Sequence, residues 1–403
     1  MEPLERVSPK LFKFQTSLTL SLKHLVEDRQ KRGLPVYDFG LGETKGTLDP
    51  AIREAGELAF REGHTFYSDP GGMPRLREAV LKWLELEGHY DIDDVVISTG
   101  AKQSLFNIFL AVCNPSDAVL LDAAPWVSYQ PLAVAAYGFP VRVLPLGTEQ
   151  ALLKVTPDDL RRNLDARPHA KLFLLNNPVN PTAQLYSADE VEDLLRVCVE
   201  RKVYFVLDRL YWRILFDGNS YPEPRVDEET KPWLVQVDGM SKNFRRAGGL
   251  RIGWAVGPTD LIQAIVKLQS HYTSGPATPT QEAALAALSG GYCVGFRREL
   301  RDKRNLLHRH AAGMPLVKIW STPATFYSFW DVRECFGSRA PDGTEIHNSD
   351  DLAAYLVRSE GVVTASGRGF MQDGYLRLSF AIPEDQIVDG MEATRRALAV
   401  LQG

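Results

Sequence analysis

The residues best suited to chemistry lie in one stretch, VDGMSKNFRRAGGLRIGW, which runs from Val237 to Trp254. It continues an apolar run that is typical of a buried strand, so Lys242 is expected in the protein interior. A buried ammonium group costs several kcal/mol unless it is paired or loses its charge. One chemical use of such a lysine is covalent, because a desolvated amine can form a Schiff base with an aldehyde.

Three further segments follow predicted strands, where ligands bind in open α/β sheets. STGAKQ (98–103) opens a helix, and its free backbone N–H groups suit a phosphate. NNPVNPT (176–182) places Asn180 in a rigid double turn, and DRLYW places Asp208 after a run of apolar residues. Each segment also has a structural explanation, as a strand–helix connection, a turn, or an aspartate paired with an arginine.

Together these segments describe a site for a phosphorylated aromatic aldehyde. The helix start and Arg251 would hold the phosphate, and Lys242 would form the Schiff base. Asp208 would lie against a protonated pyridine nitrogen. A negative charge there keeps the ring cationic, so that the ring can accept electrons from a substrate carbanion.

Apolar strands alternate with helices through the middle of the chain and would position these segments. Strands are predicted in DDVVIS, AVLLDAA, VRVLPL, KLFLLNN, VYFVLDR, WLVQVDG and RIGWAVG. This alternation predicts a mostly parallel sheet that helices cover on both faces. After about residue 280 a long helical stretch and shorter strands follow. We therefore expect a large α/β domain over residues 50–285 and a smaller α+β domain formed by 1–49 and 286–403.

The composition argues against several other classes of protein. Of the 403 residues 44% are hydrophobic and 24% charged, which is ordinary for a globular protein. The net charge is −5 without a basic block, so neither nucleic acid nor a membrane is expected as a partner. No signal core and no apolar run of ~18 residues is present, which favours a cytoplasmic protein. The four cysteines and eight histidines show neither paired nor metal-ligand spacing, so no metal is expected.

The order and spacing of these segments resemble those of the class I/II aminotransferases, the pyridoxal-phosphate enzymes of fold type I. Within them the chain is similar to the bacterial aspartate and prephenate aminotransferase branch. The resemblance runs from about Leu41 to Ile382, through GLGET, FYSDPGGMPRLREAV, STGAKQSLFN, APWVSY, NNPVNPT, DRLYW, GMSKNF, GLRIGW and YLRLSFA. It implies a three-layer α/β fold with a mostly parallel seven-stranded sheet, pyridoxal 5′-phosphate as the cofactor, and a homodimer with active sites at the subunit interface.

The resemblance also implies which residues hold the cofactor. The expected catalytic residues are the Schiff-base lysine, the pyridine-nitrogen partner and a donor to the ring hydroxyl, which match Lys242, Asp208 and Tyr211. Asn180 matches the second hydroxyl donor, and Trp126 the aromatic that stacks on the ring. The implied phosphate ligands are Gly100, Ala101, Lys102, Arg251 and Tyr67, the last reaching the neighbouring subunit.

For the substrate, Arg377 matches the arginine that clamps the α-carboxylate, and Gly42 the glycine whose backbone assists it; Trp126 and Asn180 border the same space. Without the resemblance, Trp126 could be a core aromatic, Tyr67 a surface turn residue, and Arg377 a strand residue facing water.

The implied reaction is a ping-pong transamination between an L-amino acid and a 2-oxo acid. In the resembling branch the lysine that matches Lys102 can meet a side-chain carboxylate, so aspartate or glutamate/2-oxoglutarate is expected as one partner. Two other functions stay open. The same cofactor would serve a lyase or a cyclising enzyme of specialised biosynthesis. A regulatory module on this fold would usually carry a DNA-binding segment, and residues 1–40 show neither a basic excess nor a helix-turn-helix pattern.

Several positions depart from the family pattern. Ala183 stands where a glycine is usual, Arg209 where an acidic residue is usual, and Lys45 where an acidic or small residue is common. SKNFRRAGGLRIG also has one residue more than usual between the lysine and Arg251. If a bulge does not absorb that residue, one of the two arginines at 245 and 246 would take the phosphate instead.

Overall fold

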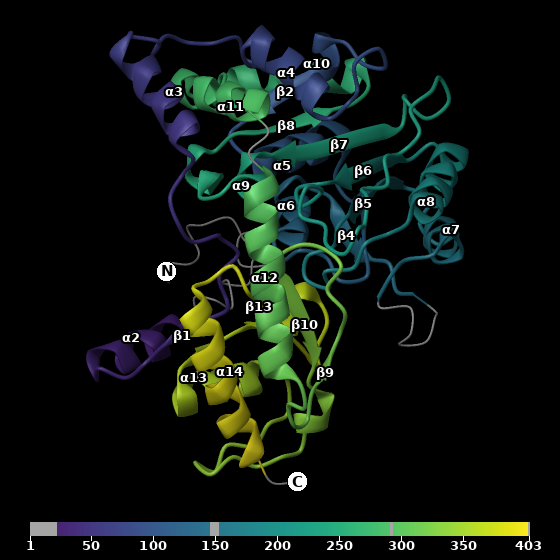
Figure 1. Cartoon of the computed structure of the whole chain (residues 1–403). Coiled ribbons are helices and arrows are strands. Elements are labelled where there is room, and N and C mark those ends of the chain that lie inside the picture. The colour runs from purple at the N-terminus through teal and green to yellow at the C-terminus, as the bar shows by residue number, and fades with distance from the viewer. Residues whose placement is uncertain (1–21, 146–152, 291–292, 402–403) are drawn as a thin grey trace, which may run out of the picture.

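The computed structural model describes residues 22–145, 153–290 and 293–401. Figure 1 shows a broad α/β layer above a smaller α+β unit, with helix α12 (Cys293–Ala311) running from one to the other. The first described helix is α2 (Lys23–Lys31).

The broad layer contains a seven-stranded sheet, which confirms the predicted fold class. Its strand order is β2-β8-β7-β6-β5-β3-β4, and β3 to β7 run parallel while β8 is antiparallel to both neighbours. The strands are β2 (Val95–Ser98), β3 (Ala118–Leu121), β4 (Phe139–Arg142), β5 (Ala170–Asn176), β6 (Tyr204–Asp208), β7 (Leu234–Gly239) and β8 (Gly253–Val256). Their near-continuous apolar sequences are explained by burial on both faces.

Helices cover both faces of this sheet because successive strand side chains point in opposite directions. Val206 packs on one face, with α5 (Ala101–Val112), α6 (Tyr129–Ala135) and α10 (Thr259–Tyr272). Phe205 and Leu207 pack on the other, with α7 (Pro157–Asp165) and α8 (Ala188–Arg201). Further along that face lie α3 (Pro50–Arg61), α4 (Pro74–Trp83) and α11 (Thr278–Gly290). Ser187 and Glu190 form a capping box at the start of α8.

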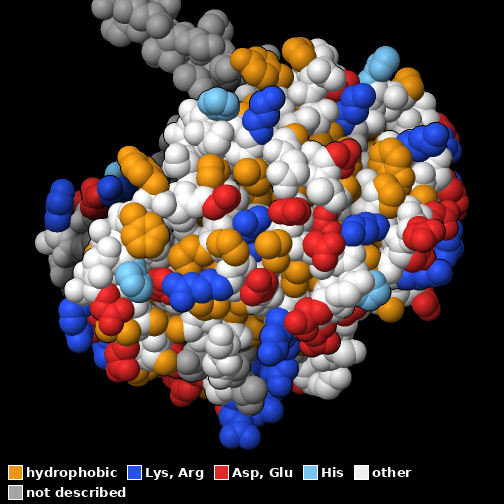
Figure 2. Space-filling view, turned by 90° about the horizontal axis from the view of Figure 1, so that it is seen from above, with side chains coloured by type: hydrophobic (Ala, Val, Ile, Leu, Met, Phe, Trp, Pro, Cys, Tyr) orange, Lys and Arg blue, Asp and Glu red, His pale blue; other side chains and the backbone are white. Residues whose placement is uncertain are grey.

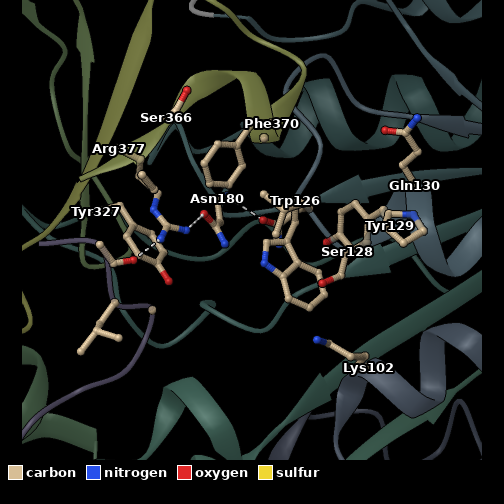
Figure 3. A pocket seen from close by; sticks show the side chains of 18 of the residues that line it. Lys102, Trp126, Ser128, Tyr129, Gln130, Asn180, Tyr327, Ser366, Phe370 and Arg377 are labelled. Carbon is tan, nitrogen blue, oxygen red and sulfur yellow. Dashed lines mark hydrogen bonds between the residues drawn. The ribbon is translucent and has the colours of Figure 1, made fainter. Parts of the chain in front are cut away.

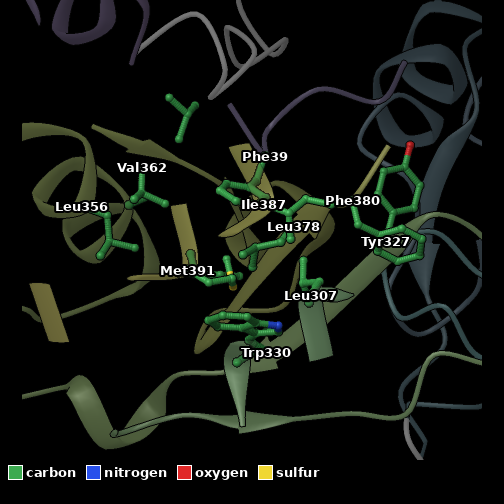
Figure 4. Packing of buried hydrophobic residues seen from close by; sticks show 14 of the residues in the cluster. Phe39, Leu307, Tyr327, Trp330, Leu356, Val362, Leu378, Phe380, Ile387 and Met391 are labelled. Atoms are coloured by element: carbon green, nitrogen blue, oxygen red, sulfur yellow. The ribbon is translucent and has the colours of Figure 1, made fainter. Parts of the chain in front are cut away.

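The smaller unit combines segments from both parts of the chain. Its four-stranded sheet has the order β12 (Ala365–Ser366), β13 (Tyr375–Ser379), β10 (Tyr327–Asp331) and β9 (Lys318–Ile319). The early strand β1 (Tyr37–Asp38) pairs in parallel with β11 (Val362–Val363). This pairing brings Gly40, which follows β1, beside β13. Helices α13 (Ser349–Glu360) and α14 (Glu384–Ala399) enclose a core that includes Phe39, Trp330, Leu378 and Met391 (Figure 4).

Within the described residues, no helix has the length and apolar character needed to span a bilayer. The same residues contain no group of three or more side chains able to hold a metal ion. Cys113, Cys198 and Cys335 are free thiols.

Candidate active site

A cavity of about 620 Å³ lies at the carboxyl ends of the parallel strands. Its walls come from the large sheet and its helices on one side and from β10, β13 and the loop before β13 on the other; Figure 3 shows part of the lining. The structure brings many predicted site residues to this one space, namely Gly42, Ala101, Lys102, Trp126, Asn180, Asp208, Tyr211, Lys242 and Arg377.

Asp208 ends strand β6 inside the cavity and is only 4% exposed. The hydroxyl of Tyr129 donates to its Oδ2 at 2.6 Å, and the backbone N–H of Leu210 donates to its Oδ1 at 3.1 Å. Burial raises the pKa of Asp208 to about 6, while these hydrogen bonds and the nearby charge of Lys242 act in the opposite direction. A cationic ring nitrogen beside this carboxylate would favour its charged form. The sequence interpretation missed Tyr129, although the APWVSY motif contains it.

Four polar side chains form a chain across the cavity. Arg377 donates from Nη1 to Oδ1 of Asn180 at 3.0 Å, and Asn180 donates from Nδ2 to the Tyr211 hydroxyl at 3.3 Å. That hydroxyl lies 3.1 Å from the hydroxyl of Tyr327. The side chain of Asn176 fixes the turn, because its Oδ1 accepts from the backbone N–H of Asn180 at 2.6 Å. No sequence pattern indicates a role for Tyr327, since FYSFWDV is equally typical of a core strand.

Arg377 is a buried cation on β13, 6% exposed, and it does not face water. Its Nη2 donates to the carbonyl of Gly40 at 3.0 Å, and its guanidinium lies 4.2 Å from the ring centre of Tyr327 and 5.0 Å from that of Phe370 (Figure 3). Among the described residues it forms no salt bridge. A rigid, uncompensated guanidinium at the cavity wall fits a planar carboxylate.

Lys242 is carried by α9 (Met240–Asn243), a single turn that follows β7. Its Nζ donates to the backbone carbonyl of Gly42. A Cβ placed on Gly42 would lie 3.0 Å from the Tyr327 hydroxyl and 3.9 Å from Nζ, so glycine keeps the space beside the lysine open. The structure therefore exposes this amine to the cavity without an acidic partner among the described residues.

The start of α5 lies against Arg251. A Cβ on Gly100, whose φ is +83°, would lie 2.5 Å from Nη2 of Arg251. A Cβ on Gly253 would lie 2.1 Å from the backbone nitrogen of Ala101, so the helix start and β8 pack with no room between them. Lys102 lies over the Trp126 ring at 4.9 Å.

Lys102 and Lys242 line this end of the cavity, and Arg251 lies beside the helix start at Gly100 without lining the cavity itself. Burial lowers the pKa of Lys102, and the charges of Arg251 and Lys242 lower it further. A helix N-terminus with two or three cations beside it fits a phosphate group.

The segment between Lys242 and Arg251 contains a short helix flanked by two residues in left-handed backbone conformations. Arg246 and Arg251 both adopt left-handed backbone conformations, with φ of +56° and +54°, on either side of the short helix η5 (Ala247–Leu250). The two arginines considered as alternative phosphate ligands pair elsewhere. Arg245 bonds to Glu299, and Arg246 lies 3.4 Å from Glu43.

The structure also shows the surroundings of Ala183 and Arg209, two other positions that depart from the family pattern. Ala183 is fully buried with φ of +61°, a conformation that favours glycine. Arg209 points away from the cavity into the protein, where Glu223 binds it. Tyr67 is 94% exposed and does not line the cavity within one chain.

The fold and the fit of these side chains to a phosphorylated pyridine define the class as pyridoxal-phosphate enzymes of fold type I. The family model for aminotransferase class I and II matches residues 31–393. A probable aspartate/prephenate aminotransferase of Rickettsia bellii is 30% identical over 98% of this chain and 99% of its own. An aspartate aminotransferase of Geobacillus stearothermophilus is 29% identical over 97% and 98%.

Solved structures agree with the sequence relatives. The aspartate aminotransferase from Rhizobium meliloti has a TM-score of 0.92 at 27% identity, covering 98% of this chain and 99% of its own. That from Thermus thermophilus with maleate has a TM-score of 0.87 at 28% identity, covering 97% and 99%. The chain belongs to the class I and II aminotransferases. It is an enzyme that uses pyridoxal phosphate to transfer amino groups, and the lyase, cyclase and regulatory alternatives are not favoured.

Proposed function

We propose that the enzyme moves the amino group between an L-amino acid and a 2-oxo acid, and that one of the two partners is a dicarboxylic acid. The observation that carries this proposal is the placement of Arg377 and Lys102 on opposite sides of the cavity (Figure 3). A substrate with two carboxylates can meet a cation at each end. The relatives named as aspartate aminotransferases, and the related structure solved with the dicarboxylate maleate, support the same substrate class.

In this proposal Arg377 and the backbone at Gly42 orient the α-carboxylate. Asp208 keeps the ring nitrogen protonated, and Asn180 with Tyr211 holds the ring hydroxyl. When bound, pyridoxal phosphate supplies a ring that withdraws negative charge from the substrate Cα. Lys242 would hold the cofactor covalently through its side-chain amine, and the same amine, when free, would act as the base that accepts the proton from the substrate Cα.

We also propose the predicted domain boundaries, near residues 49 and 285, and a homodimer in which Tyr67 reaches the phosphate of the second subunit. Tyr67 and its neighbour Phe66 are 94% and 65% exposed, and Leu58 and Phe60 on α3 are 45% and 67% exposed. Figure 2 views the molecule from above and shows hydrophobic side chains in several groups among charged ones. A second copy would cover such side chains.

A screen of amino donors against the purified holoenzyme tests the proposal. Aspartate or glutamate should change the visible spectrum of the bound cofactor, and 2-oxoglutarate or oxaloacetate should reverse the change. Release of ammonia without an acceptor would indicate a lyase instead. A spectrum that no amino acid alters would contradict transamination.

A further inference from the structure

A buried charged cluster lies behind the cavity wall that carries Lys242. Asp238, on β7, is fully buried, and its two carboxylate oxygens bind two different segments. Oδ1 accepts from Nδ2 of Asn243 at 2.9 Å, and Oδ2 accepts from Nε1 of Trp212 at 2.9 Å. The guanidinium of Arg209 lies 4.4 Å from the Trp212 ring centre, and its charge acts on Asp238. We call these four residues the Asp238 cluster.

The members of this cluster alternate in sequence with cavity residues. Asn243 follows Lys242, which donates to Gly42 at the cavity. Arg209 follows Asp208, and Trp212 follows Tyr211; both of the preceding residues line the cavity. The Asp238 carboxylate therefore binds both segments that present catalytic side chains to the cavity, through residues that do not line the cavity themselves.

Stability alone does not explain a fully buried carboxylate at this position. Burial raises the pKa of Asp238 to about 7, while the Arg209 charge, the Gly239 N–H and Trp212 lower it. Apolar residues of similar volume often replace buried ionic groups without loss of stability. What an apolar residue cannot provide is two directional acceptors that fix the distance between two turns.

The turn at Lys242 is held at its start by the backbone, where the N–H of Met240 donates to the carbonyl of Ile252 at 3.0 Å. Helix α9 has four residues and no side-chain cap. Gly239 before it is pressed against β8, since a Cβ there would lie 2.9 Å from Cα of Gly253. The Asn243 side chain also reaches the Gly239 carbonyl at 3.4 Å, so its bond to Asp238 closes the turn around Lys242.

We propose that Asp238 is a positioning residue, which sets the direction of Lys242 through Asn243 and the direction of the Asp208–Tyr211 segment through Trp212. The inference rests on the proposed covalent role of Lys242. Because a misplacement of about 1 Å can cost a reacting group roughly 100-fold in rate, loss of this link should be measurable in the reactivity of Lys242 itself.

The test uses the cofactor-free full chain and the rate at which added pyridoxal phosphate becomes attached to it, followed by absorbance and by borohydride trapping. In Asp238→Asn, the new amide nitrogen faces the N–H donor of either Asn243 or Trp212. One of the two hydrogen bonds at position 238 is therefore lost. Attachment should slow at least roughly tenfold. The double variant D238N/N243D restores both links: the amide at 238 donates to the carboxylate at 243, and its oxygen accepts from Trp212 as before. Its rate should return to within about threefold of the wild type. Asn243→Ala, which removes one link only, serves if D238N does not fold.

Glu223→Gln is the matched control, because it disturbs the same buried Arg209 from the side away from Asp238, where the two carboxylate contacts are 2.6 and 2.8 Å. It should lower the free energy of unfolding and leave the attachment rate within about twofold. An unchanged rate in D238N and N243A, or an equal slowing in E223Q, would overturn the proposal. Failure of the proposed role of Lys242 is distinguishable, since the wild-type label would then lie on another residue.

Discussion

The guanidinium of Arg377 donates to Oδ1 of Asn180 at 3.0 Å, while Nδ2 of the same amide donates to the Tyr211 hydroxyl at 3.3 Å. One asparagine thereby joins the proposed carboxylate clamp on β13 to the proposed hydroxyl donor behind β6. Because an amide has one acceptor and one donor arm, it can serve both neighbours at once. Arg377, on the substrate side of the cavity, is thus linked by hydrogen bonds through Asn180 to Tyr211, on the cofactor side.

Asn180→Ala should therefore impair both sides. We expect KM for the amino acid to rise roughly 10- to 100-fold, since charge-assisted hydrogen bonds contribute about 1.5–3 kcal/mol, and the cofactor to bind more weakly. Tyr211→Phe is the control, because it removes only the hydroxyl and leaves the Arg377 contact intact. It should weaken the cofactor with little change in KM. Steady-state kinetics and cofactor titration measure both, and an unaltered KM in N180A would refute the connection.

Gly253→Ala should disrupt the phosphate end of the cavity. The added Cβ would lie 2.1 Å from the nitrogen of Ala101 at the start of α5, so the helix or β8 must move. We expect the affinity for pyridoxal phosphate to fall at least roughly tenfold, with a loss of stability of about 1–3 kcal/mol. Gly249→Ala is the matched control, since a Cβ there meets nothing within 4 Å. Equal cofactor affinities for the two variants, measured by fluorescence titration, would contradict the packing argument.

The raised pKa of the buried Asp122 carboxyl predicts that the stability of the folded protein depends on pH. It is 2% exposed after the end of β3, and burial raises its pKa to about 7, with the Asn176 N–H lowering and the Asp208 charge raising it. The unfolded chain releases this proton near pH ~4, whereas the folded protein retains it to about pH 7. The folded state then binds more protons, so the contribution of Asp122 to stability falls as the pH rises through that window.

Asp122→Asn should remove this dependence. Its stability relative to the wild type should rise by up to about 1.4 kcal/mol per pH unit between about pH 4 and pH 7. Urea unfolding of both cofactor-free proteins at about pH 5 and about pH 7 measures the difference. A difference that stays constant with pH would show that Asp122 titrates as an ordinary surface aspartate.

Tyr67→Phe tests the proposed dimer. If this hydroxyl binds the phosphate of a second subunit, the variant should hold pyridoxal phosphate roughly 5- to 20-fold more weakly while remaining dimeric by light scattering. Tyr272→Phe is the comparison, because Tyr272 is 46% exposed and its hydroxyl donates within the subunit to Oδ1 of Asn107. A monomeric wild-type protein, or an unchanged affinity of Y67F for pyridoxal phosphate, would contradict the proposed role of Tyr67 at a subunit interface.

Most strands of the large sheet could be predicted because burial on both faces makes them short apolar runs with polar residues at their ends. Of the two edge strands, β4 was predicted less accurately: VRVLPL (141–146) was expected, β4 spans Phe139–Arg142, and residue 146 lies outside the described ranges. Edge strands carry fewer constraints on side-chain type, so their limits are poorly marked in sequence.

The site could be predicted where a residue ends a strand, as for Asp208, or lies in a motif, as for Lys242. The partners that tune these groups could not. Tyr129 reaches Asp208 from a helix 79 positions earlier, and Tyr327 reaches Tyr211 from 116 positions later. Such contacts depend on how segments far apart in the chain pack together, which local periodicity does not encode. For the same reason Arg209 was read only as a departure, and its pairing with Glu223 was not foreseen.

The central claim is that Lys242 carries the cofactor covalently, and borohydride reduction of the holoenzyme tests it most directly. After digestion, mass spectrometry should place the pyridoxyl mass on the peptide that contains Lys242, with no label in Lys242→Ala. A label on Lys102, the other lysine that lines the cavity, or on no peptide at all, would contradict the account.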